Sequence, residues 1–489
     1  MAGVLMPVAS LPSNDGVGSL GHEAYRLVDY LADTGFRLWQ VLPLNPLGYG
    51  NSPYQPYSSY AGDELYIDLD VLAEEGYLSA KRKTLPSTGR IDYDAARKHK
   101  LKYLRKAFKA FEAQGKEAAE FEAFCREDWV YPYAVFITLK ANNKMKCWNE
   151  WSKDQRDWIL NRKYDITPFE AEIRFRMWLQ YEFRKQWSAL KEYANRKGIL
   201  MVGDIPFYVG IDSLDVWKDR KSFLLDKDGR PTFIAGVPPD YFSPVGQRWG
   251  NPIYNWEVLE ETGFRFWIDR LKYSMGLYDI IRIDHFRAFD TYWKIPASCE
   301  TAVEGEWVEA PGYALFDKLF ETLPDIWIVA EDLGDLRPEV LELRDAYGLP
   351  GMNIAEFTLM VPDNTKNQVI YTGTHDNQTV VGWYKSMDPK ERKKTDRRLG
   401  REGRKGKNIS YRMLHHVFHS AADYAIVPVM DLLELDDSAR LNTPGTVGSP
   451  NWEWQLTDLS ELEPYRAGIR RMLRYAGRIS QPQAEQEKP

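Results

Sequence analysis

The sequence contains little cysteine. Its three cysteines, Cys125, Cys147 and Cys299, are an odd number without CxxC or Cys/His spacing. This excludes a disulfide framework and a structural zinc site, and it is typical of a reducing compartment. An excess of basic residues is also missing, because 64 Lys and Arg stand against 71 Asp and Glu and the net charge is −7. We therefore expect neither nucleic acid nor an anionic membrane as the main partner.

Long apolar runs are absent as well. No window approaches the ~20 apolar residues of a membrane span, and the N-terminal MAGVLMPVASLPS has no basic start and meets Pro7 early. The sequence has no HExxH, calcium-loop or GxxxxGK[ST] motif, so we expect no metal, no cofactor and no sugar-nucleotide donor. These absences predict a cytoplasmic protein, or a plastid form that lacks its transit peptide.

Aromatic residues, in contrast, are abundant and make up 14% of the 489 residues. Such richness suits either a protein that stacks its ligands or a core rich in tryptophan. Apolar residues at 44% and charged residues at 28% permit a large core. At roughly 150 residues per domain the length corresponds to about three domains, although barrels run longer as one unit.

Eight short apolar runs that end in polar residues read as parallel strands buried on both faces. They span 3–8, 36–44, 199–207, 279–286, 326–333, 351–357, 369–376 and 425–433. Helical patterns precede several of them, at 22–34, 170–197, 312–323 and 337–347. Eight strands that alternate with helices predict an α/β fold, a (β/α)8 TIM barrel. The alternative fold is a doubly wound sheet, but this sequence has no GxGxxG motif after its first predicted strand.

The spacing of these strands is unequal. Long gaps after the second and third strands predict largely helical and loop insertions, at about 66–165 and 208–262, the second with an aromatic Pro/Gly stretch at 237–256. Loops of this kind commonly build the site of a barrel enzyme. The short gap between 357 and 369 predicts a degenerate unit. We expect one catalytic domain over 1–479, followed by a tail at 480–489.

One segment, 385–407, is strongly basic. Its composition suits either a solvated helix face or an anion-binding patch.

Reactive side chains gather where the predicted strands end. They are Asp204, Arg282, Asp284, His285, Glu331, Asp332, His375 and Asp376. The C-terminal strand ends of a barrel form its active face. A single buried carboxylate is often structural, but a converging set is costly to bury without pairing. We therefore expect these side chains to line a functional site.

Local contexts indicate different roles for these side chains. Arg282 and Asp284 point to the same side of a strand, so the guanidinium should lower the pKa of Asp284 and keep it ionised for nucleophilic attack. Glu331 follows an apolar run that should raise its pKa, as a general acid requires. His375 beside Asp376 offers hydrogen bonds to ligand hydroxyls. Together with many aromatics, these groups are typical of a retaining glycosidase site.

Six motifs, taken in order, resemble those of the 4-alpha-glucanotransferases of the amylomaltase (disproportionating enzyme) family, glycoside hydrolase family 77, which are relatives of the α-amylases. They are PLNPLGYGNSPYQPYSSYAG, GDIPFYV, RWGNPIYNW, IRIDHFR, AEDLG and GTHDN. The similarity runs from LPSNDGVGSLG near the N-terminus to NTPGTVGSPNWEWQL near the C-terminus. The resemblance implies a retaining enzyme that moves segments of α-1,4-glucan to the 4-hydroxyl of another glucan or of glucose. Its partners would be α-1,4-glucans, maltooligosaccharides and glucose.

The resemblance also implies residue roles: Asp284 as nucleophile, Glu331 as general acid/base and Asp376 as stabiliser of the transition state. It implies substrate binding by Tyr54, Asp204, Trp249, Arg282, His285, His375 and Asn451. For Asp204, His285 and the aromatics, a packing role is the alternative.

Two features depart from the family pattern. Gln378 follows THDN where the family usually shows an acidic residue, and the short connection after 357 leaves the glucan subsites there in doubt. No C-terminal β-sandwich domain is predicted.

Two other functions are compatible with parts of this pattern. A hydrolase would use the same carboxylates but release the glucosyl group to water, and the choice depends on the exclusion of water. A catalytically inactive glucan-binding protein would be expected to have lost one of the three carboxylates.

Overall fold

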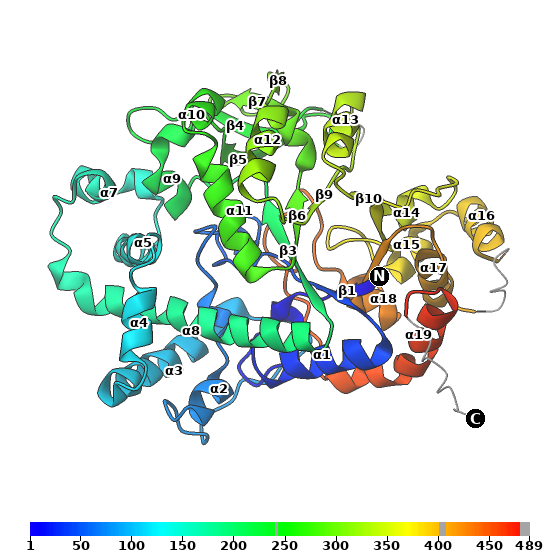
Figure 1. Ribbon diagram of the computed structural model, residues 1–489, viewed down its shortest axis with the longest axis horizontal. Coiled ribbons are helices and arrows are strands. Elements are labelled where there is room, and N and C mark those ends of the chain that lie inside the picture. Colours follow the sequence, from blue (N-terminus) through cyan, green and yellow to red (C-terminus); the bar gives the residue numbers. More distant parts are fainter. Residues whose placement is uncertain (240–242, 401–406, 480–489) are drawn as a thin grey trace, which may run out of the picture.

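Eight parallel strands form a ring in the computed structural model, which describes residues 1–239, 243–400 and 407–479 (Figure 1). Their order is β10-β11-β12-β1-β2-β3-β6-β9. The bounds are β1 (Ala2–Leu5), β2 (Leu38–Gln40), β3 (Leu200–Pro206), β6 (Ile280–Asp284), β9 (Ile328–Ala330), β10 (Gly351–Ile354), β11 (Gln368–Tyr371) and β12 (Tyr424–Pro428). The Ala330 N–H donates to the Pro350 carbonyl at 2.9 Å, which joins β9 to the start of β10. The predicted TIM barrel is confirmed, and each predicted run overlaps one strand.

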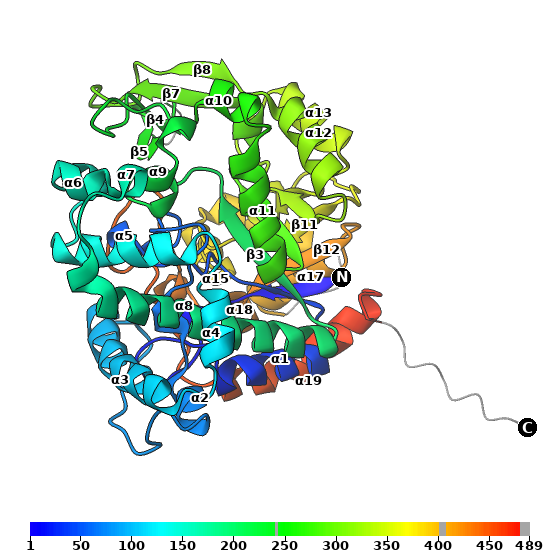
Figure 2. The same cartoon turned by 60° about the vertical axis from the view of Figure 1, so that its left-hand side comes forward.

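The predicted helices of the barrel are present as well. They are α1 (His22–Thr34), α8 (Glu170–Arg196), α12 (Gly312–Thr322) and α13 (Pro338–Ala346), and α11 (Arg265–Leu277), α15 (Val380–Ser386), α17 (Ile409–Phe418) and α19 (Glu463–Tyr475) complete the outer layer. α1 lies between α8 and α19 along one side of the molecule (Figures 1 and 2). α1 ends at Gly35, whose φ of 101° is left-handed and therefore suits glycine.

A helical insertion follows β2, as expected. It contains α2 (Leu69–Glu74), α3 (Tyr93–Gln114), α4 (Ala118–Phe124), α5 (Val130–Asn142), α6 (Lys153–Arg156) and α7 (Trp158–Asn161). α5 is mostly apolar and is buried from Pro132 to Lys140, where it packs on α8.

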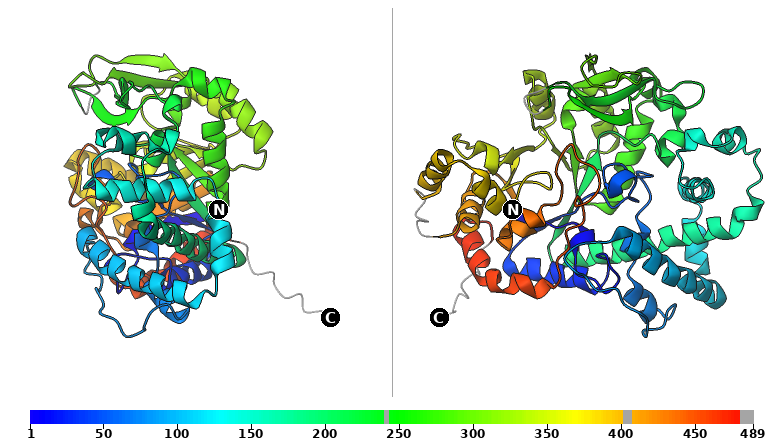
Figure 3. Two further views of the ribbon diagram at one scale, coloured as in Figure 1. Left: turned by 90° about the vertical axis from the view of Figure 1, so that its left-hand side faces the viewer. Right: turned by 180° about the vertical axis from the view of Figure 1, so that it is seen from behind.

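The second insertion differs from the expected helices and loops. Together with a segment after β6, it forms an antiparallel sheet of order β5-β4-β7-β8, beyond the ends of β3 and β6 (Figures 1 and 3). The strands are β4 (Phe233–Val237), β5 (Gln247–Pro252), β7 (Thr291–Pro296) and β8 (Glu306–Glu309), with α9 (Leu214–Lys218) and α10 (Trp256–Glu261) nearby. The prediction of a loop over 237–256 was therefore wrong for β5. Residues 240–242 lie outside the described part of the chain.

Two shorter predictions concern the second half of the barrel. The unit between β10 and β11 is abbreviated as expected, since its helix α14 (Ala355–Thr358) has four residues. In the basic segment, α16 (Pro389–Leu399) presents Lys390, Lys393 and Lys394 to solvent, as on a solvated helix face. Residues 401–406 of that segment and the predicted tail 480–489 lie outside the described residues. After β12 the chain continues as α18 (Val429–Leu432), short turns and α19.

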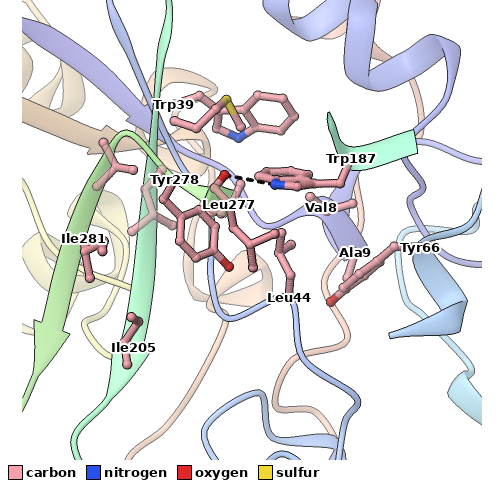
Figure 4. Packing of buried hydrophobic residues seen from close by; sticks show 14 of the residues in the cluster. Val8, Ala9, Trp39, Leu44, Tyr66, Trp187, Ile205, Leu277, Tyr278 and Ile281 are labelled. Carbon is pink, nitrogen blue, oxygen red and sulfur yellow. Dashed lines mark hydrogen bonds between the residues drawn. The ribbon is translucent and has the colours of Figure 1, made fainter. Parts of the chain in front are cut away.

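The core between the barrel and its helices is rich in aromatic rings. The Trp187 indole N–H donates to the Leu277 carbonyl at 2.9 Å, and Trp39 and Tyr278 pack beside it (Figure 4). Part of the aromatic excess is therefore core packing. None of the helices in the described ranges is long and apolar enough to cross a bilayer.

Candidate active site

Two of the predicted carboxylates lie at the ends of neighbouring strands. Asp284 is the last residue of β6, and Glu331 follows β9 directly. The Glu331 N–H donates to the Ile283 carbonyl at 3.0 Å, and the Phe286 N–H donates to the Glu331 carbonyl at 3.0 Å. These backbone bonds hold the two segments side by side beyond the last strand pair.

His285 turns the chain immediately after Asp284. Its φ of 56° is left-handed, a conformation uncommon for residues other than glycine, although histidine adopts it more often than most. In this conformation its N–H donates to Glu331 Oε2 at 2.5 Å. One carboxyl oxygen of Glu331 is thereby engaged by the backbone.

Arg282 links two carboxylates beneath this turn. Its Nη1 lies 2.6 Å from Asp204 Oδ1, and its Nη2 lies 3.3 Å from Asp284 Oδ1. The Arg282 and Asp204 side chains are almost completely buried, whereas that of Asp284 is 31% exposed. The expected contact between Arg282 and Asp284 is therefore present, and Asp204 completes the pairing of the buried cation.

Burial controls the pKa values of both strand-end carboxyls. It raises the pKa of Asp284 to about 7, and although Arg282 opposes this shift, the prediction of a lowered pKa was wrong. Burial, followed by the charge of Asp284, raises the pKa of Glu331 to about 8, as expected. Asp284 alone of the two contacts the guanidinium, and this contact favours its ionised form.

Tyr54 and His375 form one wall of the site. The Tyr54 hydroxyl donates to Asp204 Oδ2 at 2.7 Å, and its ring stacks on His375 with centroids 5.0 Å apart. Trp452, which the sequence analysis did not identify, lies 5.8 Å from the Tyr54 ring and 5.9 Å from His375. Burial lowers the pKa of His375, so its ring is neutral.

Asp376 is oriented by the loop after α18. Its Oδ2 lies 3.4 Å from His375 Nε2, while Asn442 Nδ2 donates to its Oδ1 at 2.6 Å. Arg440 Nη2 donates to the Asp376 carbonyl at 2.7 Å. Neither Arg440 nor Asn442 was predicted from the sequence, although Asn442 begins the NTPGTVGSPNWEWQL motif.

Asn451 lies in the same loop as Asn442. It accepts from the Thr443 N–H at 2.9 Å and donates to Thr446 Oγ1 at 2.9 Å. Among the contacts of the described residues, none joins Asn451 to the three carboxylates.

A second group of rings, Trp249 and its neighbours, packs around His285. The Trp249 ring meets the His285 ring edge to face, with centroids 4.9 Å apart, and Tyr208 lies 6.2 Å from both. Burial lowers the pKa of His285 to about 3, so this ring is also neutral. Tyr208 was not predicted, although it belongs to the GDIPFYV motif.

Asp332 is the one strand-end carboxylate with a purely structural set of contacts. It accepts from the Met352 N–H at 2.7 Å and pairs with Arg344. Over residues 1–239, 243–400 and 407–479, no three His, Cys, Asp or Glu side chains are grouped as metal ligands. The remaining strand-end side chains thus converge on one site bounded by aromatic rings.

The site can be compared with those of known proteins. Residues 6–460 match the sequence family described as 4-alpha-glucanotransferase. The chain belongs to this 4-alpha-glucanotransferase family. It is 43% identical to the 4-alpha-glucanotransferase of Thermus thermophilus, over 98% of this chain and 99% of the relative. The family resemblance and the enzyme class predicted from the sequence are confirmed.

Two further members extend the comparison. The fold matches the amylomaltase of Streptococcus agalactiae in complex with acarbose, with a TM-score of 0.93, 35% identity and coverage of 98% of this chain and 99% of that one. A chloroplast and amyloplast 4-alpha-glucanotransferase of Arabidopsis thaliana is 37% identical over 98% of this chain and 86% of the relative. As a 4-alpha-glucanotransferase, the chain acts on α-1,4-glucans.

Proposed function

We propose that the protein transfers a segment of an α-1,4-glucan to the 4-hydroxyl of another glucan or of glucose by a retaining double displacement. The observation that carries this proposal is the pairing of Asp284 and Glu331 at neighbouring strand ends. One carboxyl contacts a guanidinium and ionises first, while the other retains its proton. Two carboxyls in different protonation states are what this chemistry requires.

Asp284 is the nucleophile in the first step. It attacks the anomeric carbon, and the bond from that carbon to the glycosidic oxygen breaks as Glu331 donates its proton to the departing oxygen. Because the backbone engages Oε2 of Glu331, the proton is transferred from Oε1. Asp376 stabilises the positive charge that develops on the sugar ring.

The second step reverses the first with a new partner. Glu331 accepts the proton of the acceptor 4-hydroxyl, whose oxygen displaces Asp284 and restores the α-configuration. An acceptor is favoured over water only if it is held in place while water is kept out. Tyr54 stacks on His375 and Trp249 packs against His285, so both place aromatic rings near the carboxylates, where sugar faces can stack.

The substrates follow from this arrangement. We infer that maltooligosaccharides and longer α-1,4-glucans serve as donors, and that these sugars and glucose serve as acceptors. Acarbose in the Streptococcus agalactiae relative supports a site for an oligosaccharide. The three free cysteines and the bacterial and plastid relatives support action in the cytoplasm or in a plastid.

Incubation with maltotriose tests the proposal. Transfer conserves the number of glycosidic bonds, so glucose and a ladder of longer maltodextrins should form while reducing ends stay nearly constant. The products are resolved by chain length, and reducing ends are counted in parallel. A steady rise in reducing ends without longer products would establish a hydrolase instead.

A further inference from the structure

Glu356 is a buried carboxyl beside the loop 372–380, which carries His375 and Asp376. It lies in α14 just after β10, and only 8% of the residue is exposed. Its N–H donates to the Thr372 carbonyl at 3.3 Å. Its Oε1 is buried without a hydrogen-bond partner among the described residues. An ionised carboxylate in that setting would be costly.

Two further carboxylates surround the same loop and are already engaged by it. Asp431 Oδ1 accepts from the Val380 N–H at 2.8 Å, and its Oδ2 accepts from the Thr372 hydroxyl. Asp437 accepts from the Thr379 N–H at 3.0 Å and from the Gln378 amide at 2.6 Å. Both groups act as acceptors, and their negative charges disfavour a third one on Glu356 nearby.

The cation that faces this cluster is directed elsewhere. Arg440 Nη2 donates to the Asp376 carbonyl, and its Nε donates to the Asn442 carbonyl, each at 2.7 Å. None of the contacts in the described part of the chain joins Arg440 to Glu356. Within the described ranges, Glu356 therefore has no contacting counter-ion.

The Glu356 carboxyl lies close to the loop at Gly373. A Cβ atom built on this glycine would lie 2.9 Å from Asn377 Cβ, 3.4 Å from Glu356 Oε1 and 3.4 Å from the Gln378 carbonyl oxygen. A negative charge on Glu356 would have neither a hydrogen-bond donor at Oε1 nor a contacting cation among the described residues, whereas a neutral carboxylic acid avoids that cost. The local geometry thus favours a neutral carboxylic acid.

We propose that Glu356 is a positioning residue, held as an uncharged carboxylic acid, that supports the loop 372–380 and so places His375 and Asp376 against the glucan. This inference rests on the proposed function, because it concerns the loop that presents Asp376. Burial, followed by the charges of Asp431 and Asp437, raises the pKa of Glu356 to about 9.

Kinetics on maltotriose at pH 7 provide the first test. Glu356→Gln keeps the shape and the neutral state, so its kcat should stay within about twofold of the wild type. Glu356→Ala removes the support, and kcat should fall at least about tenfold, with little change in KM, because small misplacements near the chemistry are costly. Glu342→Gln on the exposed face of α13 is the matched control. Equal losses in the Gln and Ala variants would overturn the proposal.

Stability against pH is the second test and needs no activity. The unfolded chain releases the Glu356 proton near 4.5, whereas the folded protein keeps it up to about 9. The wild type therefore loses stability relative to Glu356→Gln as pH rises through this window. The difference in melting temperature between the two should grow from pH 5 to 9 and then level off. A constant difference, or a Gln variant that fails to fold, would overturn the proposal.

The two proposals fail in distinguishable ways. If the wild type does not disproportionate maltotriose, the proposed function is wrong, whatever the melting curves show. If the wild type does so and Glu356→Ala keeps its kcat, only the role of Glu356 is wrong.

Discussion

Asp284 and Glu331 share a site but differ in what contacts them, and this difference should separate them kinetically. Asp284→Asn and Glu331→Gln should each lower kcat on maltotriose by about 10²-fold or more, because proton transfer alone contributes 10²–10⁴-fold. With an activated donor whose leaving group needs no proton, Glu331→Gln should recover glycosylation and Asp284→Asn should not. Rapid-mixing kinetics measure this step. If both variants lose the same fraction of the glycosylation rate with this donor, the roles assigned to Asp284 and Glu331 are wrong.

The same pair predicts the dependence of activity on pH. Asp284 must be ionised and Glu331 protonated, so kcat/KM should fall as pH drops through the pKa of Asp284 and as it rises through that of Glu331. Because burial raises these values to about 7 and about 8, the optimum should lie near neutrality. In Glu331→Gln with the activated donor, the alkaline decline should disappear. An optimum near pH 4 would show that burial does not raise these pKa values.

For single residues, the sequence predicted correctly those side chains that lie at the ends of strands. Arg282 and Asp284 are two residues apart on β6, so their shared direction follows from strand geometry. It failed for Arg440 and Asn442, which approach Asp376 from a loop that no periodicity describes. It also failed for the pKa of Asp284, because the extent of burial depends on the whole fold.

Among the elements, β3 depends on a glycine at its centre. A Cβ on Gly203 would lie 2.2 Å from the Tyr278 ring, which is buried. We expect Gly203→Ala to destabilise the protein by about 1–3 kcal/mol through overpacking. Urea unfolding measures the change.

The matched control is Gly276→Ala, an exposed position in the last turn of α11 where a Cβ meets no atom within 4 Å. That change should be neutral or slightly stabilising, since alanine favours helix. If both variants lose the same stability, the contact with Tyr278 is not the cause.

Elements were predictable where their apolar pattern was continuous. The barrel strands are buried on both faces and read as unbroken apolar runs. The sheet of β4, β5, β7 and β8 was missed because β5 reads QRWGNP, with the glycine and proline expected of a loop. Two of its strands also come from another part of the chain, so their pairing has no local signal.

For the whole molecule, Arg478 ties the C-terminal region to the start of the barrel. It donates to the Phe418 carbonyl at 2.6 Å, the Ala422 carbonyl at 3.0 Å and the Met1 carbonyl at 3.1 Å. We expect Arg478→Gln to lower the free energy of unfolding by about 2–3 kcal/mol, because hydrogen bonds from a charged donor are lost and carbonyls stay unpaired.

The control for this variant is Arg474→Gln. Arg474 is exposed and lies in the last turn of α19, before Arg478 in the chain. Urea unfolding of the two proteins measures the difference, and kcat at 25 °C should be unchanged in both. Equal stability of the two variants would show that the links made by Arg478 do not hold the barrel together.

The position of β1 has a consequence for synthesis on the ribosome. β1 pairs with β2 and also with β12, so Val4 lies opposite both Trp39 and Val427. This strand therefore emerges long before one of its two neighbours exists, and its open edge stays available for wrong pairings until β12 has been translated. A newly made chain thus has a long interval in which a chaperone that shields this edge would raise the yield of folded enzyme.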